Sequence, residues 1–148
     1  MDGMSDNKPS ETAVRAWAKL IRAQQALLDQ VEEDLKNAGF PPLVWYDILL
    51  ELHRDPAGRL RHRDLHRRML LAKYNLSRLL DRMADDGLVD REPVADDARG
   101  EYLRITAQGR DLRRRMWPVY QRAIYRHFAS RLGAGDVGEL IRILEKLA

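Results

Sequence analysis

Two hydrophobic patterns of different period follow each other within residues 72–105. Residues 72–87 carry apolar side chains at intervals of three and four, as one face of an α-helix requires. Residues 88–105 instead hold two short apolar runs on either side of a polar loop, which predicts a two-stranded hairpin with a long tip. Only a few folds place a helix directly before a β-hairpin, so this order of elements limits the possible fold class. The apolar residues of the helical stretch are Leu76, Leu79, Leu80 and Met83.

The preceding residues predict two further helices in the same lobe. Residues 42–53 are apolar almost all round, so we expect a central, buried helix there. Residues 60–71 fit a short helix with Leu65 and Met69 directed inward. A short helix, a tight connection, a second helix and a hairpin form a winged helix-turn-helix. The predicted fold is therefore mainly α with a small β-hairpin wing, and residues 42–105 form its winged helix-turn-helix lobe.

Polar side chains crowd the first half of the second helix of this motif. Tyr74, Arg78 and Arg82 are spaced by four residues and so share one helix face. The major groove of duplex DNA admits an α-helix, and there Arg can pair with guanine and Asn with adenine. A merely solvated helix face is the alternative interpretation. The candidates for base contacts are Tyr74, Asn75, Arg78 and Arg82, and those for phosphate contacts are Lys73 and Ser77.

Positive charge is concentrated in the same region. The formal net charge is only +3, yet residues 59–78 hold seven Lys or Arg side chains and one acid, Asp64. Clustered cations favour a polyanionic partner, which is double-stranded DNA for this motif. The chain has no cysteine, which excludes disulfides, a thiol redox switch and a cysteine-based metal site.

The sequence patterns before and after the lobe predict long helices at both ends of the chain. A helix over residues 10–38 begins at Ser10, a good N-cap, and carries a heptad-like apolar stripe; residues 107–148 are also mainly helical. The stripes either pack along the domain's own core or form a subunit interface. We favour the interface because a helix of about 28 residues, or ~40 Å, exceeds the diameter of a small domain. The candidate dimer-interface residues are Val14, Trp17, Ile21, Phe128, Leu140, Ile141 and Leu144.

Three motifs resemble the MarR family of bacterial transcriptional regulators. They are NLSRLLDRMADDGLVDRE at residues 75–92, DAR at residues 97–99 and LRITAQG at residues 103–109. In the family these segments are the end of the recognition helix with the following strand, the wing tip, and the start of the next helix. The resemblance spans roughly residues 10–148, which we expect to form a single domain after a flexible tail, residues 1–9.

The resemblance implies a homodimer in which the terminal helices, residues 10–38 and 107–148, serve dimerisation. It implies a wing that places Arg99 in or near the minor groove, with Asp97 bracing it and Arg91 at the basic position of the strand. Relatives usually cap the recognition helix with Ser or Thr, whereas this chain has Ala72, so we expect that cap to be missing.

Aromatic residues give a candidate ligand pocket, although core packing alone is the favoured account for any one of them. Many members of the family that the chain resembles are repressors released by small, often aromatic, anions, so a small aromatic or anionic effector is the implied ligand. The residues that could line the pocket are Trp17, Trp45, Tyr46, Trp117 and Tyr120.

Nothing in the sequence predicts catalysis, a cofactor or a metal site. His62 and His66 stand four apart, as two metal ligands would, but no third ligand is evident. No nucleophile–base pattern and no Gly-rich phosphate loop is present. No apolar run approaches the ~20 residues that span a bilayer, so we expect no membrane partner. The resemblance to the MarR family implies a cytoplasmic, nucleoid-associated bacterial protein.

These observations together predict a sequence-specific DNA-binding transcriptional regulator that is not an enzyme. The specific hypothesis is a homodimeric repressor of a pseudo-palindromic operator, released by a small aromatic or anionic ligand. The alternative is a winged-helix adaptor that binds proteins and not DNA.

Overall fold

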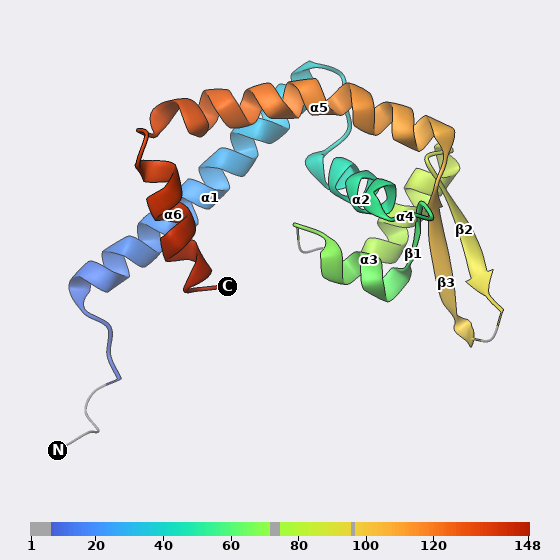
Figure 1. Ribbon diagram of the computed structural model, residues 1–148, viewed down its shortest axis with the longest axis horizontal. Helices are drawn as coiled ribbons and strands as arrows, with labels where there is room; N and C mark the ends of the chain where they lie inside the picture. The colour runs from blue at the N-terminus through green and yellow to red at the C-terminus, as the bar shows by residue number, and fades with distance from the viewer. Residues whose placement is uncertain (1–6, 72–74, 96) are drawn as a thin grey trace. The chain divides into compact units, whose positions relative to one another are not determined.

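The computed structural model describes residues 7–71, 75–95 and 97–148, without the side chains of residues 97–99 (Figure 1). The chain forms two compact units. One combines Met1–Glu33 with Ala123–Ala148, and the other is Asp34–Arg122.

The helical part of the second unit contains α2 (Leu43–Arg54), α3 (His62–Arg68) and α4 (Leu76–Asp85). Helix α2 is central, as the sequence predicts, because it is buried on most of its faces. The other two helices each turn one apolar face to the same core. Fully buried side chains of this core are Ile48, Leu49, Leu52, Leu65, Leu80, Met83, Leu103 and Met116.

A three-stranded antiparallel sheet completes the lobe in the order β1-β3-β2, with β1 at Arg59–Arg61, β2 at Val89–Val94 and β3 at Asp97–Ile105. The sheet and the helices confirm the mainly α fold with a small wing, which projects as the β2–β3 hairpin (Figure 1). Strand β1 was not predicted, because its single buried residue, Leu60, gives no alternation to recognise.

The long hairpin tip predicted from the sequence is wrong. Val94 pairs with Asp97, so the turn between the strands is short. The polar residues that suggested a loop belong to the strands, since ladder hydrogen bonds use backbone groups and tolerate polar side chains on an exposed face.

The wing joins the next helix, α5 (Ala107–His127), through a tight corner. The Thr106 hydroxyl donates to the Gly87 carbonyl at 2.7 Å and accepts from the Gly109 amide at 3.0 Å, which caps α5. A Cβ atom on Gly109 would lie 2.3 Å from the Leu88 carbonyl oxygen, so the close approach of α5 to the strand requires glycine. Thr106 and Gly109 of the LRITAQG segment thus determine how the start of α5 packs against the end of the preceding segment.

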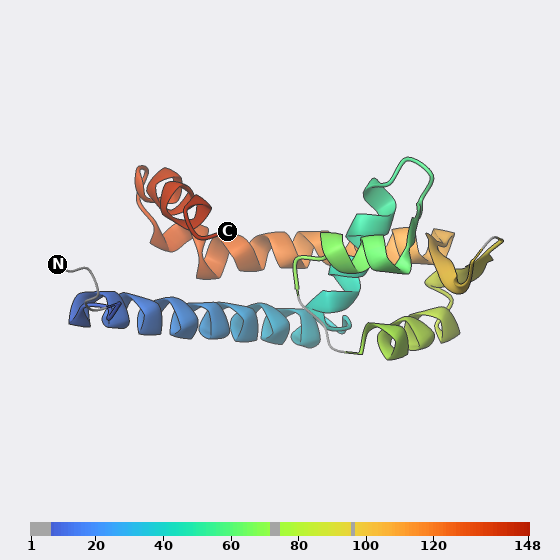
Figure 2. The ribbon, with the colours of Figure 1, turned by 90° about the horizontal axis from the view of Figure 1, so that it is seen from below.

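Helix α1 (Glu11–Asn37) is one uninterrupted helix (Figure 2), and the Ser10 hydroxyl accepts a hydrogen bond from the Ala13 amide at 3.0 Å. This confirms the predicted N-cap. The unit to which its first part belongs also contains η1 (Ala129–Arg131) and α6 (Asp136–Glu145). Several large apolar side chains of this unit are exposed, among them Trp17, Ile141, Leu144 and Leu147.

None of the helices in the described part of the chain has the length and hydropathy that a membrane span requires.

Candidate nucleic-acid interface

Helix α4 presents an apolar face to the core and a polar face to solvent. Leu76, Leu80 and Met83 are buried, whereas Arg78 and Arg82 are exposed one turn apart. No other described residue forms an ion pair or hydrogen bond with either guanidinium. Two unengaged guanidinium groups on one exposed helix face can bind phosphates or the edges of guanines.

The start of α4 differs from the sequence prediction. The helix begins at Leu76, and Asn75 takes the N-cap position with φ −78° and ψ 54°. Asn75 therefore lies at the exposed N-terminal end of the helix, three residues before Arg78.

The N-cap position of α4 lies at Asn75, and the expectation about Ala72 is not tested by the described residues. Asn75 occupies that position, although its side chain makes no capping hydrogen bond. Ala72, Lys73 and Tyr74 lie outside the described residues, so the predicted contacts of Lys73 and Tyr74 stay predictions.

A side-chain contact ties the first turn of α4 to the first residue of α3. The Ser77 hydroxyl and the His62 Nε2 atom are 3.3 Å apart. His62 is thus engaged with a neighbouring hydroxyl, while His66 is exposed. Within the described residues, no group of three or more His, Cys, Asp or Glu side chains is arranged to hold a metal ion.

Arg91 of β2 is bound by protein groups on both sides of its guanidinium. Its Nε donates to Glu101 of β3 at 2.9 Å, and its Nη1 donates to the Asp81 carboxylate and to the Ser77 carbonyl of α4, the latter at 3.2 Å. Hydrogen bonding between the two groups raises the pKa of Arg91 and lowers the pKa of Glu101. Arg91 therefore joins the two wing strands to α4.

The wing tip carries two predicted DNA contacts. Asp97 and Arg99 belong to β3, at the end of the hairpin next to its turn. Their side chains lie outside what the structure describes.

Other cations of the lobe are partly engaged on the sheet. Arg59 of β1 lies over the Tyr102 ring at 4.1 Å and pairs with Glu92 at 3.6 Å. Arg104 of β3 also pairs with Glu92, at 3.3 Å. These contacts stabilise strand pairs across the sheet and leave the exposed cations of α4 as the clearer candidates for DNA.

Three of the five residues of the predicted ligand pocket form one cluster. Tyr46, Trp117 and Tyr120 form an aromatic cluster with ring centroids 5.2–6.1 Å apart. Trp45 is partly buried on α2 and makes no ring contact of this kind within the described residues. Trp17 belongs to the other compact unit and is 64% exposed.

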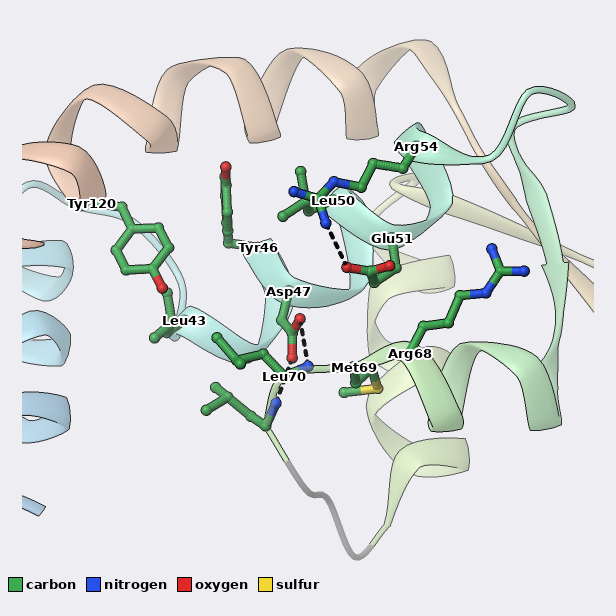
Figure 3. A pocket seen from close by; sticks show the side chains of 11 residues that line it. Leu43, Tyr46, Asp47, Leu50, Glu51, Arg54, Arg68, Met69, Leu70 and Tyr120 are labelled. Carbon is green, nitrogen blue, oxygen red and sulfur yellow. Dashed lines mark hydrogen bonds and ion pairs between the residues drawn. The ribbon is translucent and has the colours of Figure 1, made fainter. Parts of the chain in front are cut away.

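A cavity of about 410 Å³ lies beside this cluster (Figure 3). Tyr46 and Tyr120 line it, and burial raises the pKa of both phenols, so both stay protonated at neutral pH and can donate hydrogen bonds. The charged residues of its wall are Asp47, Glu51, Arg54 and Arg68.

Two residues of this region were missed by sequence reasoning. Glu101 looked like one of many surface acids, and nothing in its spacing marks it as the partner of Arg91. Asp47 had a usable signal, because it is an acid inside an otherwise apolar run, residues 43–50. It is buried and accepts two backbone hydrogen bonds from residues between α3 and α4.

Comparisons with known proteins agree with this architecture. Residues 38–100 match the model of the MarR family. The chain is 26% identical to the uncharacterized HTH-type transcriptional regulator YkoM of Bacillus subtilis (strain 168) over 136 residues, which are 92% of this chain and 86% of that protein.

Solved structures of regulators are similar over nearly the whole chain. AbsC, a MarR family transcriptional regulator from Streptomyces coelicolor, matches with a TM-score of 0.83 and 29% identity over 96% of this chain and 95% of that one. Sco3205, a MarR family regulator from the same organism solved in complex with DNA, matches with a TM-score of 0.80 and 26% identity, covering 95% and 92% of the two chains. With its winged helix-turn-helix lobe, the chain is similar over nearly its whole length to transcriptional regulators of the MarR family.

Proposed function

We propose that this chain is a transcriptional regulator of the MarR family and that it binds a pseudo-palindromic operator in double-stranded DNA as a homodimer. Residues 42–105 serve as the DNA-binding lobe, and residues 10–38 and 107–148 serve dimerisation within a single domain. The observation that carries the proposal is the exposed face of α4, where Arg78 and Arg82 have no protein partner among the described residues.

In this proposal α4 is the recognition helix. Arg78 and Arg82 reach base edges in the major groove, and Asn75 and Ser77 contact the groove edge or phosphates near the helix start. Arg91 acts through α4 and the wing, because its guanidinium donates to protein carboxylates. Arg99 supplies the wing contact in the minor groove, where a narrow groove attracts cations. The similar regulator Sco3205 was solved in complex with DNA, which supports DNA binding by this chain.

Dimerisation is supported by the exposed apolar side chains of the first unit. Trp17 is 64% exposed and Ile141 is 53% exposed. Large apolar groups at this exposure are typical of a surface that is covered by a partner. A second copy of the chain would place two recognition helices in successive major grooves about 34 Å apart.

A repressor role fits a dimer that occludes its operator, and the cavity beside Tyr46 and Tyr120 is the candidate effector site. The Tyr120 phenol can donate a hydrogen bond, and the guanidinium groups of Arg54 and Arg68 offset the carboxylates of Asp47 and Glu51 in the cavity wall, which suits a small aromatic ligand with an anionic group. Such a ligand releases DNA only by binding more tightly to the conformation that does not fit the operator.

Binding of the full chain to a random-sequence duplex of about 30 bp, three helical turns, separates a DNA-binding protein from an adaptor. We expect binding that weakens steeply as salt is raised, because cations that contact phosphates release counterions. Single-stranded DNA of the same length is the control and should bind more weakly. Absence of duplex binding even at low salt would favour the winged-helix adaptor.

A further inference from the structure

Asp47 of α2 is a buried charged residue in the core of the DNA-binding lobe. It is 5% exposed, which makes it the one charged residue that is buried in the described part of the chain. Burial of a carboxylate costs several kcal/mol unless hydrogen bonds compensate the lost hydration. A charge kept in this position therefore needs strong local partners.

Those partners are two consecutive backbone amides that follow α3. Oδ1 of Asp47 accepts from the Leu70 amide at 3.0 Å, and Oδ2 accepts from the Leu71 amide at 2.8 Å (Figure 3). The two residues belong to the connector between α3, which ends at Arg68, and α4, which begins at Leu76. Each oxygen of the carboxylate thus holds one point of the connector.

Other packing at this point of the connector is weak. Leu70 is 75% exposed, so its side chain is not held in the core. The cavity of about 410 Å³ lies against Met69, Leu70 and Leu71, so part of the space at the connector is not filled by side chains. Hydrogen bonds to an ionised acceptor are worth more than neutral ones, and here they replace apolar packing as the anchor.

We propose that Asp47 is a positioning residue that fixes the path of the connector and thereby the start of the recognition helix. Only a few residues separate Leu71 from the N-cap Asn75, so the anchored amides limit where α4 can begin. The start of α4 in turn sets the direction of Arg78 and Arg82. The consequence for DNA rests on the proposed function, whereas the anchoring of the connector does not.

The test is Asp47→Asn, with Glu51→Gln as the matched control. Asn keeps the shape of the side chain but offers one acceptor oxygen to two amide donors. Glu51 lines the same cavity from the same helix and pairs only with Arg54 among the described residues, at 3.4 Å. Both variants therefore remove one negative charge from the cavity wall, and only the first changes the connector.

Hydrogen exchange of the full chain measures the anchor without DNA. In Asp47→Asn we expect the Leu70 and Leu71 amides to exchange about tenfold faster or more, as loss of a charge-assisted hydrogen bond predicts. The Met116 amide in α5 should keep its protection, and Glu51→Gln should match the wild type. Unchanged exchange at Leu70 and Leu71, or an equal rise at every amide, would overturn the proposal.

DNA binding measures the consequence. With a duplex selected from a random pool, the affinity ratio of selected to random duplex should fall about tenfold in Asp47→Asn and stay constant in Glu51→Gln. A wild-type ratio in Asp47→Asn despite faster exchange would overturn the positioning role. A wild-type protein that binds the selected and the random duplex equally well would instead contradict the proposed function. The hydrogen exchange of the Leu70 and Leu71 amides would still test whether Asp47 anchors the connector.

Leu70→Pro provides a second variant if Asp47→Asn does not fold. It leaves Asp47 in place and removes one of the two donors, and the extended backbone of Met69, with ψ 140°, is the conformation favoured before proline. We expect the same selective rise in exchange at Leu71 and the same fall in the affinity ratio. Wild-type behaviour of this variant would contradict the proposal.

Discussion

The arginines of the lobe divide into two groups according to their partners. Arg91 and Arg104 donate to carboxylates of neighbouring strands, and so their guanidinium groups hold the protein together. Arg78 and Arg82 are exposed, and no described residue pairs with them. Because a guanidinium has a fixed set of donors, the unengaged side chains are the ones available to DNA.

Arg78→Ala tests the assignment of a base contact. We expect specific binding to weaken by about 1–3 kcal/mol, together with relaxed preference at one base position, because a bidentate contact to guanine is lost. The measurement is a binding titration against the selected duplex and its single-base variants. Arg114→Ala is the control, since Arg114 is exposed on α5 and its loss changes the net charge equally. Equal behaviour of the two variants would contradict the assignment.

The ion pair of Arg91 with Glu101 predicts a pH dependence of stability. Hydrogen bonding to Arg91 lowers the pKa of Glu101 in the folded chain. The carboxylate therefore stabilises the fold fully above the unfolded pKa of about 4.3, and this contribution is lost as pH falls through the lower folded value. The difference in unfolding free energy between wild type and Glu101→Gln should shrink below about pH 4. A difference that is constant between pH 7 and pH 3 would contradict the pairing.

At the residue scale, the sequence predicts which side chains are buried better than it predicts which polar groups meet. Leu76, Leu80 and Met83 are buried as their spacing requires, because one helical period fixes one face. The contacts of Asp47 and Arg91 join segments that are distant in sequence, so no local pattern contains them.

At the scale of elements, α4 and the wing behave as one assembly. Arg91 and Glu101 connect the strands to the Asp81 carboxylate of α4, and Thr106 with Gly109 closes the corner to α5. Helix α4 and the wing are thus held in a fixed orientation relative to each other, which the proposed contact of both elements with DNA requires.

Arg99→Ala tests the contribution of the wing. We expect weaker binding and a smaller salt dependence, with the slope of log K against log salt reduced by about one, as loss of one phosphate contact predicts. The measurement is a series of titrations at several salt concentrations, with Arg114→Ala as the charge control. A slope equal to that of the wild type would remove Arg99 from the interface.

The kinds of elements could be predicted from the sequence, but some of their limits could not. Helix α1 follows from a long periodic pattern and from the cap at Ser10, and α2 follows from a run that is apolar almost all round. Strand β1 has three residues and is defined by pairing with β3, which is a tertiary contact. The start of α4 at Leu76 is likewise not marked by the apolar spacing, which extends the helical pattern back to residue 72.

At the scale of the whole molecule, the exposed apolar surface of the first unit is where we place the proposed dimer interface. Trp17 of α1 and Ile141 and Leu144 of α6 are all exposed in the single chain. Helix α6 in particular has no buried residue, although its apolar side chains are numerous. A second copy of the chain accounts for both observations.

Ile141→Glu tests this interface. A buried charge without a partner is costly, so we expect the dimer to dissociate at concentrations where the wild type stays dimeric. Sedimentation at micromolar protein measures the change, and Lys146→Glu, an exposed polar position at the end of the same helix, is the control. A wild-type protein that sediments as a monomer would contradict the dimer directly.

The central claim is that two copies of the chain read a symmetric DNA sequence through α4. Selection of bound sequences from a random duplex pool by the full-length wild type tests this claim most directly. The account predicts an enriched palindrome whose half-sites lie about one helical turn, or ~34 Å, apart. A pool that stays random after repeated selection would contradict it.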